Sequence, residues 1–283
     1  MTLDALARDS GTFVMVAMDQ RESLRTMLAQ HHNEVGRERI AAFKQGVARE
    51  LSPHASGFLI DAEHVAAVRP HVPPSCGLIV AADVLEQPRG GIVEETGLDE
   101  HVDLAAAAAV ALKLLVIWRD DERRAERVSM SRRFVELAAE CGVLSVLEGV
   151  VRVPDHVDRD AAVVEAAAEL AGVGPSLYKC EVPMRGRGDA VEIEQRSRGI
   201  DAVVRCPWVV LSQGVDPDDF PAAVEAACRG GASGMLAGRA VWTATLAGDD
   251  PTELLRTHSV PRLHELARIV DAHARPWREK LKC

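Results

Sequence analysis

Short apolar runs recur along the chain, and longer alanine-rich, charged segments separate them. Eight of these runs are expected to be buried strands: "TFVMVAM" (12–18), "GFLID" (57–61), "GLIVAA" (77–82), "LKLLVIW" (112–118), "LSVLEGV" (144–150), "SLYKCEV" (176–182), "PWVVLS" (207–212) and "SGMLAG" (233–238). Helical patterns lie between most of them, and "DAAVVEAAAELAGVG" ends at a glycine, as helices often do. Eight strands alternating with helices within 283 residues predict a (β/α)8 TIM barrel.

An open, doubly wound sheet is the alternative with the same alternation. It is disfavoured because no GxGxxG fingerprint follows the first run. No linker or low-complexity tract divides the chain, so residues 1–283 are expected to form a single domain. The longest irregular stretch, residues 85–103, is interpreted as a loop with part of a helix, and a role as a lid is left open.

Composition excludes several classes of function. The net charge of −10 and the lack of an arginine-rich tract argue against a nucleic-acid partner. The amino terminus lacks the basic and apolar regions of a signal peptide, and the longest apolar run is interrupted by Lys113 and is too short to span a bilayer. The 6 cysteines form no CxxC pair, which favours reduced thiols in the cytoplasm over disulfides or zinc. We expect a cytoplasmic homo-oligomer without a metal or cofactor.

Lys179 stands in the middle of an apolar run, "PSLYKCEVP" (175–183). Its neighbours predict a strand buried on both faces, where desolvation disfavours the ammonium form. A lysine is costly there unless a neutral amine is needed.

Polar residues follow most of the predicted strands. In a TIM barrel the carboxyl ends of the strands meet on one face, where the chemistry takes place. The residues expected on that face are Asp19, Gln20, Arg21, Asp61, Glu63, Lys113, Glu148, Lys179, Ser212, Gln213, Gly214, Gly238 and Arg239.

Each of these residues also has a structural interpretation. Asp19 could cap a helix, Asp61 could close a turn, and Lys113 with Glu148 could form a structural ion pair. Glu181 is interpreted as the partner of a nearby cation. The coincidence of two lysines with two or three carboxylates, each at its own strand end, favours a catalytic site.

Two lysines close together suggest a mechanism. Two ammonium groups about 6 Å apart repel by roughly 3 kcal/mol, which lowers the pKa of one of them by about 2 units. Such an amine can form a Schiff base with a ketone while a glutamate moves the protons. An aspartate can then deprotonate the hydroxyl whose collapse breaks a carbon–carbon bond, which is class I aldolase chemistry.

The last two predicted strands suggest an anion site. Both "LSQGVD" and "LAGRAVW" put a glycine at a strand end, where backbone N–H groups can approach a phosphate, and Arg239 adds a bidentate cation. A phosphorylated small-molecule substrate is therefore predicted.

The motifs "AMDQRESLRTML", "FLIDAEH", "ALKLLVIWRDDE", "LEGVVRVP", "LYKCEVP", "WVVLSQGVD" and "GASGMLAGRAVW" resemble those of class I aldolases related to tagatose-1,6-bisphosphate aldolase. The resemblance runs from about residue 10 to 270 and is strongest to the sulfofructosephosphate aldolases.

The resemblance implies a role for each matched residue. It implies Lys179 as the Schiff-base nucleophile, Glu148 as the acid and base, Lys113 as the second lysine and Asp19 as the group that handles the cleavage proton. Further matched positions imply contacts with the phosphate of dihydroxyacetone phosphate: Ser212, Gly214, Gly238 and Arg239.

The chain departs from the sulfofructosephosphate pattern at three places: Gln213 replaces a small hydroxyl, Gly149 replaces a proline, and "EETG" (94–97) is closer to the tagatose branch. Three hypotheses stay open. The first is a ketose 1-phosphate aldolase, acting on 6-deoxy-6-sulfofructose 1-phosphate or a ketohexose bisphosphate. The others are a different Schiff-base lyase and a catalytically quiet sugar-phosphate-binding regulator.

The far end of the substrate is expected near the first two strands. Gln20, Arg21 and Arg25 would contact it there, with Asp61 and Glu63 adding negative charge. Because a sulfonate carries a single charge, this mixed rim favours the sulfosugar as substrate.

Overall fold

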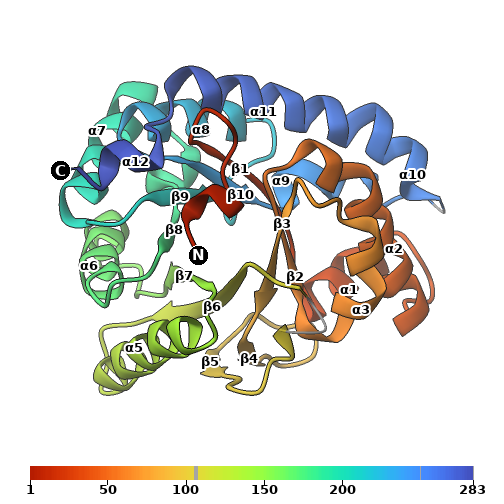
Figure 1. The fold of residues 1–283 in the computed structure, drawn as a ribbon, viewed down its shortest axis with the longest axis horizontal. Helices are drawn as coiled ribbons and strands as arrows, with labels where there is room; N and C mark the ends of the chain where they lie inside the picture. The colour runs from red at the N-terminus through yellow and green to blue at the C-terminus, as the bar shows by residue number, and fades with distance from the viewer. Residues whose placement is uncertain (105–107, 249, 283) are drawn as a thin grey trace.

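Eight parallel strands close into a barrel in the order β1-β10-β9-β8-β7-β6-β3-β2 (Figure 1). The computed structural model describes residues 1–104, 108–248 and 250–282. The barrel strands are β1 (Phe13–Met18), β2 (Gly57–Asp61), β3 (Gly77–Ala81), β6 (Ala111–Trp118), β7 (Leu144–Val151), β8 (Leu177–Glu181), β9 (Trp208–Leu211) and β10 (Gly234–Ala237). The prediction of a (β/α)8 TIM barrel is confirmed, and each observed strand starts and ends within one residue of its apolar run.

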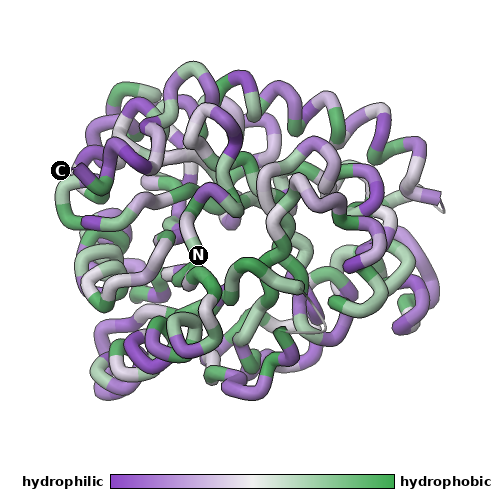
Figure 2. Tube along the Cα trace, in the orientation of Figure 1, coloured by the Kyte–Doolittle hydropathy of each residue, from purple (hydrophilic) through white to green (hydrophobic). Residues whose placement is uncertain are grey.

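Helices surround the strands, and their outer surfaces are mainly hydrophilic while the strands are hydrophobic (Figures 1 and 2). They are α1 (Glu22–Ala29), α2 (Arg37–Leu51), α3 (Val65–Val68), α5 (Arg124–Glu140), α6 (Arg159–Ala171), α7 (Ala190–Val203), α8 (Phe220–Arg229), α9 (Arg239–Trp242), α10 (Pro251–Leu254), α11 (Val260–His273) and α12 (Trp277–Lys280). Within the described ranges, no helix is both long and apolar enough to cross a membrane. Five cysteines are free thiols, and Cys283 lies outside the described residues.

Alternate residues of each strand point into the barrel or out toward the helices. The inward side chains, among them Met15, Leu59 and Val146, form a core inside the barrel. Leu3 and Leu6 of the amino-terminal segment join this core, so they close the end of the barrel at which the strands begin. The opposite end, at the carboxyl ends of the strands, is left for polar groups.

The register of neighbouring strands sets which polar side chains meet. Glu148 of β7 lies directly beside Lys179 of β8 and beside Leu115 of β6. Lys113 stands two residues before Leu115 on β6, where it pairs with Val146. All three polar residues have the inward parity of their strands, so they point into the barrel near its carboxyl end.

The segment after β3 differs from the predicted irregular loop. Residues 83–98 form an antiparallel hairpin of β4 (Asp83–Glu86) and β5 (Glu95–Leu98), and no helix is found within 85–103. Glu95 of β5 accepts a 2.6 Å hydrogen bond from the buried guanidinium of Arg127 on α5. This ion pair fixes the hairpin to the helix layer, which an interpretation based on turn residues alone did not foresee.

Candidate active site

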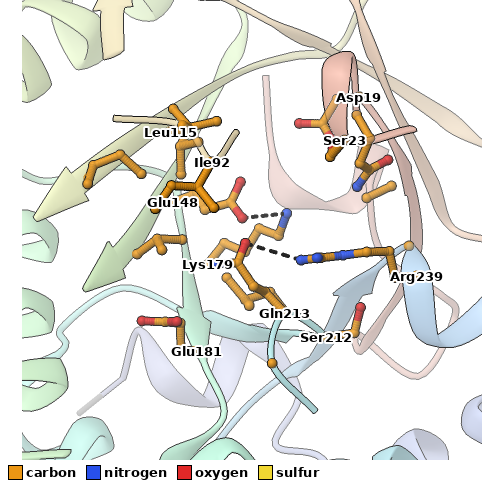
Figure 3. A pocket seen from close by; sticks show the side chains of 18 of the residues that line it. Asp19, Ser23, Ile92, Leu115, Glu148, Lys179, Glu181, Ser212, Gln213 and Arg239 are labelled. Atoms are coloured by element: carbon orange, nitrogen blue, oxygen red, sulfur yellow. Dashed lines mark hydrogen bonds and ion pairs between the residues drawn. The ribbon is translucent and has the colours of Figure 1, made fainter. Parts of the chain in front are cut away.

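A cavity of about 390 Å³ opens at the carboxyl ends of the strands (Figure 3). Eleven of the predicted site residues line it: Asp19, Gln20, Arg21, Lys113, Glu148, Lys179, Ser212, Gln213, Gly214, Gly238 and Arg239. They come from six strands, as the rule for barrel active sites predicts.

Three carboxylates surround the ammonium group of Lys113. Its Nζ lies 2.8 Å from Asp19 Oδ2, 2.9 Å from Asp83 Oδ2 and 2.8 Å from Glu148 Oε2. Burial alone would lower the pKa of Lys113, but the negative charges of Asp19, Asp83 and Glu148 outweigh it and hold the pKa well above its usual value. Lys113 is therefore a fixed cation that orients two carboxylates, not a nucleophile.

Glu148 connects the two lysines. One carboxylate oxygen contacts Lys113, and the other, Oε1, lies 3.0 Å from Lys179 Nζ, the ion pair drawn in Figure 3. Burial opposes ionisation of Glu148, but the charges of Lys113 and Lys179 hold its pKa below the usual value. Burial opposes ionisation of Asp19 as well, and its pKa is lowered mainly by Lys113 and then Lys179. Both carboxylates can thus accept protons from a bound substrate.

The expected lysine–lysine repulsion is not the dominant interaction here. Because three carboxylates compensate the charge of Lys113, the charge cluster is held together by attraction between unlike charges. What distinguishes Lys179 is that it forms one ion pair among the described residues, whereas Lys113 forms three. Lys179 would therefore lose fewer ion pairs than Lys113 if its amine were to attack a substrate.

Asp83 is a site residue that the sequence interpretation missed. It is the first residue of β4, two positions after β3 ends, and its side chain is 2% exposed. One carboxylate oxygen accepts from Lys113, and the other from Arg21 at 2.9 Å. The sequence interpretation considered polar residues at the ends of the predicted strands. Asp83 would have been found if the search at "GLIVAADV" had continued two residues beyond the strand end.

The opposite side of the cavity carries Arg239 and the glycine turns. Arg239 Nη2 donates a 3.1 Å hydrogen bond to Gln213 Oε1 (Figure 3). Burial lowers the pKa of Arg239, and the charges of Glu148 and Asp19 oppose that effect. A side chain at Gly238 would put a Cβ 2.4 Å from the Ala17 carbonyl oxygen, so this turn requires glycine.

Gln20 has an unused acceptor in the cavity. Its Oε1 is buried without a hydrogen-bond partner among the described residues. An unsatisfied buried oxygen costs free energy, which a hydroxyl donor of a ligand can recover. Its position agrees with the expected role in substrate binding.

Asp61 does not reach the cavity. Its carboxylate bonds to the ammonium of Lys44 on α2 and lies 2.6 Å from His64 Nδ1, and it is absent from the described lining residues. Asp61, Glu63 and His64 could offer three metal-ligand atoms, but Lys44 already holds the positive charge beside Asp61. The structure therefore gives Asp61 an ion pair with the helix layer.

The two arginines that were expected to contact the far end of the substrate are bonded to other groups of the protein. Arg21 bonds to Asp83, and Arg25 donates to the Val35 carbonyl at 2.6 Å and pairs with Glu22 at 3.4 Å. Arg25 does not line the described cavity. Glu181 pairs with Arg159 at 2.6 Å, which confirms its interpretation as the partner of a cation.

A barrel whose strand ends bring a buried lysine amine onto a carboxylate has the architecture of a lyase that works through a Schiff base, a class I aldolase. The chain belongs to the DeoC/LacD family of aldolases, whose family profile matches residues 13–244. It is therefore an enzyme of the aldehyde-lyase class, and the hypothesis of a quiet regulator is dropped.

Two relatives show how far the sequence similarity extends. Tagatose 1,6-diphosphate aldolase of Staphylococcus epidermidis is 25% identical over 327 aligned positions, covering 99% of this chain and 97% of the relative. Tagatose 1,6-diphosphate aldolase 2 of Streptococcus pyogenes is 26% identical over 313 positions, covering 96% and 94%.

Solved structures share the fold at lower identity. Fructose-bisphosphate aldolase of Plasmodium falciparum superposes with a TM-score of 0.74 at 12% identity, covering 96% of this chain and 93% of that one. An archaeal fructose-1,6-bisphosphate aldolase, whose catalytic lysine is covalently bound to the carbinolamine intermediate of its substrate, gives 0.63 at 15% identity, covering 95% and 98%.

Proposed function

We propose that the protein cleaves a ketohexose 1,6-bisphosphate, of the tagatose type, to dihydroxyacetone phosphate and glyceraldehyde 3-phosphate. The observation that carries the proposal is the Glu148 carboxylate, 3.0 Å from the amine of Lys179 and 2.8 Å from that of Lys113. The names of the relatives support a bisphosphate as the substrate.

Lys179 attacks the substrate ketone in this proposal. Glu148 takes one proton from the Lys179 ammonium across their contact, and the amine adds to C2 to give a carbinolamine. Glu148 then returns a proton to the departing hydroxyl, so that water leaves and an iminium forms. Lys113 keeps its own proton throughout, because the three carboxylates stabilise its ammonium form.

Cleavage follows from the iminium. Asp19 accepts the proton of the C4 hydroxyl, the C3–C4 bond breaks, and its electrons pass to the iminium to form an enamine. The aldehyde leaves first. Protonation at C3 and hydrolysis of the iminium then release dihydroxyacetone phosphate and regenerate the Lys179 amine. The phosphate is held throughout by Arg239, Ser212 and the backbone at Gly214 and Gly238.

The alternative substrate is 6-deoxy-6-sulfofructose 1-phosphate, which would yield sulfolactaldehyde. The motifs "ALKLLVIWRDDE" and "LYKCEVP" favour it. A comparison of kcat/KM for sulfofructose 1-phosphate and tagatose 1,6-bisphosphate decides between them, and we expect at least a tenfold preference for the bisphosphate.

Trapping of the covalent intermediate tests the mechanism. Borohydride reduction with dihydroxyacetone phosphate is expected to leave one adduct per chain, on the peptide that contains Lys179. Lys179→Ala removes both the adduct and the activity, whereas Lys113→Met, the matched loss of a buried lysine, retains trapping at Lys179. An adduct on another lysine, or activity that survives Lys179→Ala, contradicts the assignment.

A further inference from the structure

Three arginines line one side of the cavity without any role in the mechanism above. Arg152 directly follows β7, Arg159 is the first residue of α6, and Arg185 lies in the turn after β8. None of them was singled out from the sequence, because each stands beyond the end of its strand. We call them the arginine cluster.

The arginine cluster carries more donors than its own contacts use. Arg159 Nη2 donates to Glu181 Oε1 at 2.6 Å, and Arg152 Nη1 makes a 3.3 Å contact with the Val151 carbonyl. Arg152 Nε and Arg159 Nη1 are buried and have no hydrogen-bond partner in the described part of the chain. Buried guanidinium N–H groups without acceptors are destabilising, so an anion that accepts from them would stabilise the cluster.

The local charge balance points to a dianion. Three guanidinium groups and one carboxylate, that of Glu181, line this side of the cavity, and the second Glu181 oxygen accepts from the Val151 backbone N–H at 2.8 Å. Burial lowers the pKa of Arg152; Glu181 opposes this, while Arg159, Arg119 and Arg185 lower it further. The excess of about two positive charges matches the charge of a phosphate monoester near neutral pH.

The turn that carries Arg185 is strained in a way that holds it at the cavity. Met184 and Arg185 have φ of 57° and 53°, in the left-handed region that residues other than glycine rarely adopt. The Met184 N–H donates to Asp160 Oδ1 at 2.9 Å, which ties the turn to α6. The stem of Arg185 lies against Gly214, where an added Cβ would be 3.4 Å from its Cδ.

The arginine cluster lies on the mouth side of the reacting amine. Glu181 follows Lys179 by two residues on β8, and Arg152 stands four residues after Glu148, just beyond the end of β7; all four line the cavity. Two residues of a strand advance by about 6.6 Å. The cluster is therefore displaced outward from Lys179 by the span of a short carbon chain, while Arg239 serves the other end of the substrate.

We propose that Arg152, Arg159 and Arg185 form a second anion subsite, which binds the terminal phosphate on the aldehyde half of the substrate. The inference rests on the proposed function, because it takes Lys179 as the point of attachment at C2. It replaces the expected far-end site near Gln20 and Arg21.

The test separates the two phosphates of the substrate. Arg152→Gln is expected to lower kcat/KM for tagatose 1,6-bisphosphate at least 30-fold, but less than threefold for tagatose 1-phosphate. Binding of the unreactive analogues hexitol 1,6-bisphosphate and hexitol 1-phosphate, measured by calorimetry, is expected to show the same difference without any need for turnover. Trapping with dihydroxyacetone phosphate, which lacks the far group, stays unchanged in this variant.

Arg187→Gln is the matched control, since Arg187 is exposed in the same loop and does not line the described cavity. Equal losses for both hexitols in Arg152→Gln, or unchanged affinity for the bisphosphate, overturn the subsite. Failure of the proposed function gives a different result in the wild-type protein: no trapping at Lys179, or no preference for tagatose 1,6-bisphosphate over sulfofructose 1-phosphate.

Discussion

Lys113 and Lys44 are both buried among carboxylates, but only Lys113 faces the cavity. Lys113 extends from β6 into the barrel, where Asp19, Asp83 and Glu148 surround it. Lys44 extends from α2 toward the end of β2 and meets Asp61, with both side chains at most 1% exposed. A buried lysine–carboxylate contact is thus shared by a candidate catalytic cluster and a structural ion pair.

The difference between the two clusters lies in what remains accessible. The Lys113 cluster shares Glu148 with Lys179, and Asp19, Glu148 and Lys179 all line the cavity. The carboxylate of Asp61 is fully engaged by Lys44 and His64. Access to a ligand, rather than burial or charge, separates function from stability here.

The largest expected effect is on activity, from matched removal of the two ammonium groups. Lys113→Met should lower kcat/KM about 1000-fold, roughly 4 kcal/mol, since Asp19 and Glu148 lose the donor that orients both. Lys44→Met should change it less than about threefold. Both are measured at a temperature where circular dichroism shows the variants folded. Equal losses would mean that the Lys44 pair also acts in the reaction.

The next effect, on stability and not on activity, is expected at Asp61. Asp61→Asn leaves the ammonium of Lys44 buried and unpaired, which should lower the free energy of unfolding by about 3–5 kcal/mol in urea titrations. The double variant with Lys44→Met should recover part of this loss, because neither charge then stays buried. The control Glu225→Gln breaks an exposed pair with Arg229 and should cost at most about 0.5 kcal/mol. A loss at Asp61 no larger than the control would contradict a structural pair.

The sequence predicted the barrel well because its signal is local. Each apolar run has the length and composition of a buried strand, and the alternation with helices leaves few architectures. The site at the strand ends followed from the same rule, and eleven of the thirteen residues expected on that face line the cavity. Asp61 also stands at a strand end, but its carboxylate forms an ion pair with Lys44 instead of facing the cavity. No local sequence pattern shows that the helix carrying Lys44 packs beside this strand end.

The residues that sequence reasoning missed share one property. Asp83, Arg152, Arg159 and Arg185 all stand after the strands end, where the direction of a side chain depends on turn geometry and not on strand parity. The left-handed backbone at Met184 and Arg185 is an example, because residues of these types give no sign of positive φ. Ion pairs across the barrel decide where such side chains point.

The smallest expected effect is the pH dependence of the Asp61 contribution. Burial raises the pKa of this carboxyl, but the hydrogen bond from His64 and the charge of Lys44 outweigh burial and hold it below the usual value. A carboxyl whose pKa is depressed in the folded protein contributes stability that is complete above the unfolded pKa of about 3.9. That contribution is lost as the pH falls from there through the folded pKa.

The difference in unfolding free energy between wild type and Asp61→Asn should therefore stay constant from about pH 7 to 5. Below about pH 4 it should shrink by at most 1.36 kcal/mol per pH unit. Urea titrations at half-unit steps measure this difference, and a gap that already narrows between pH 7 and 6 would mean that a group titrating near neutrality controls the pair instead.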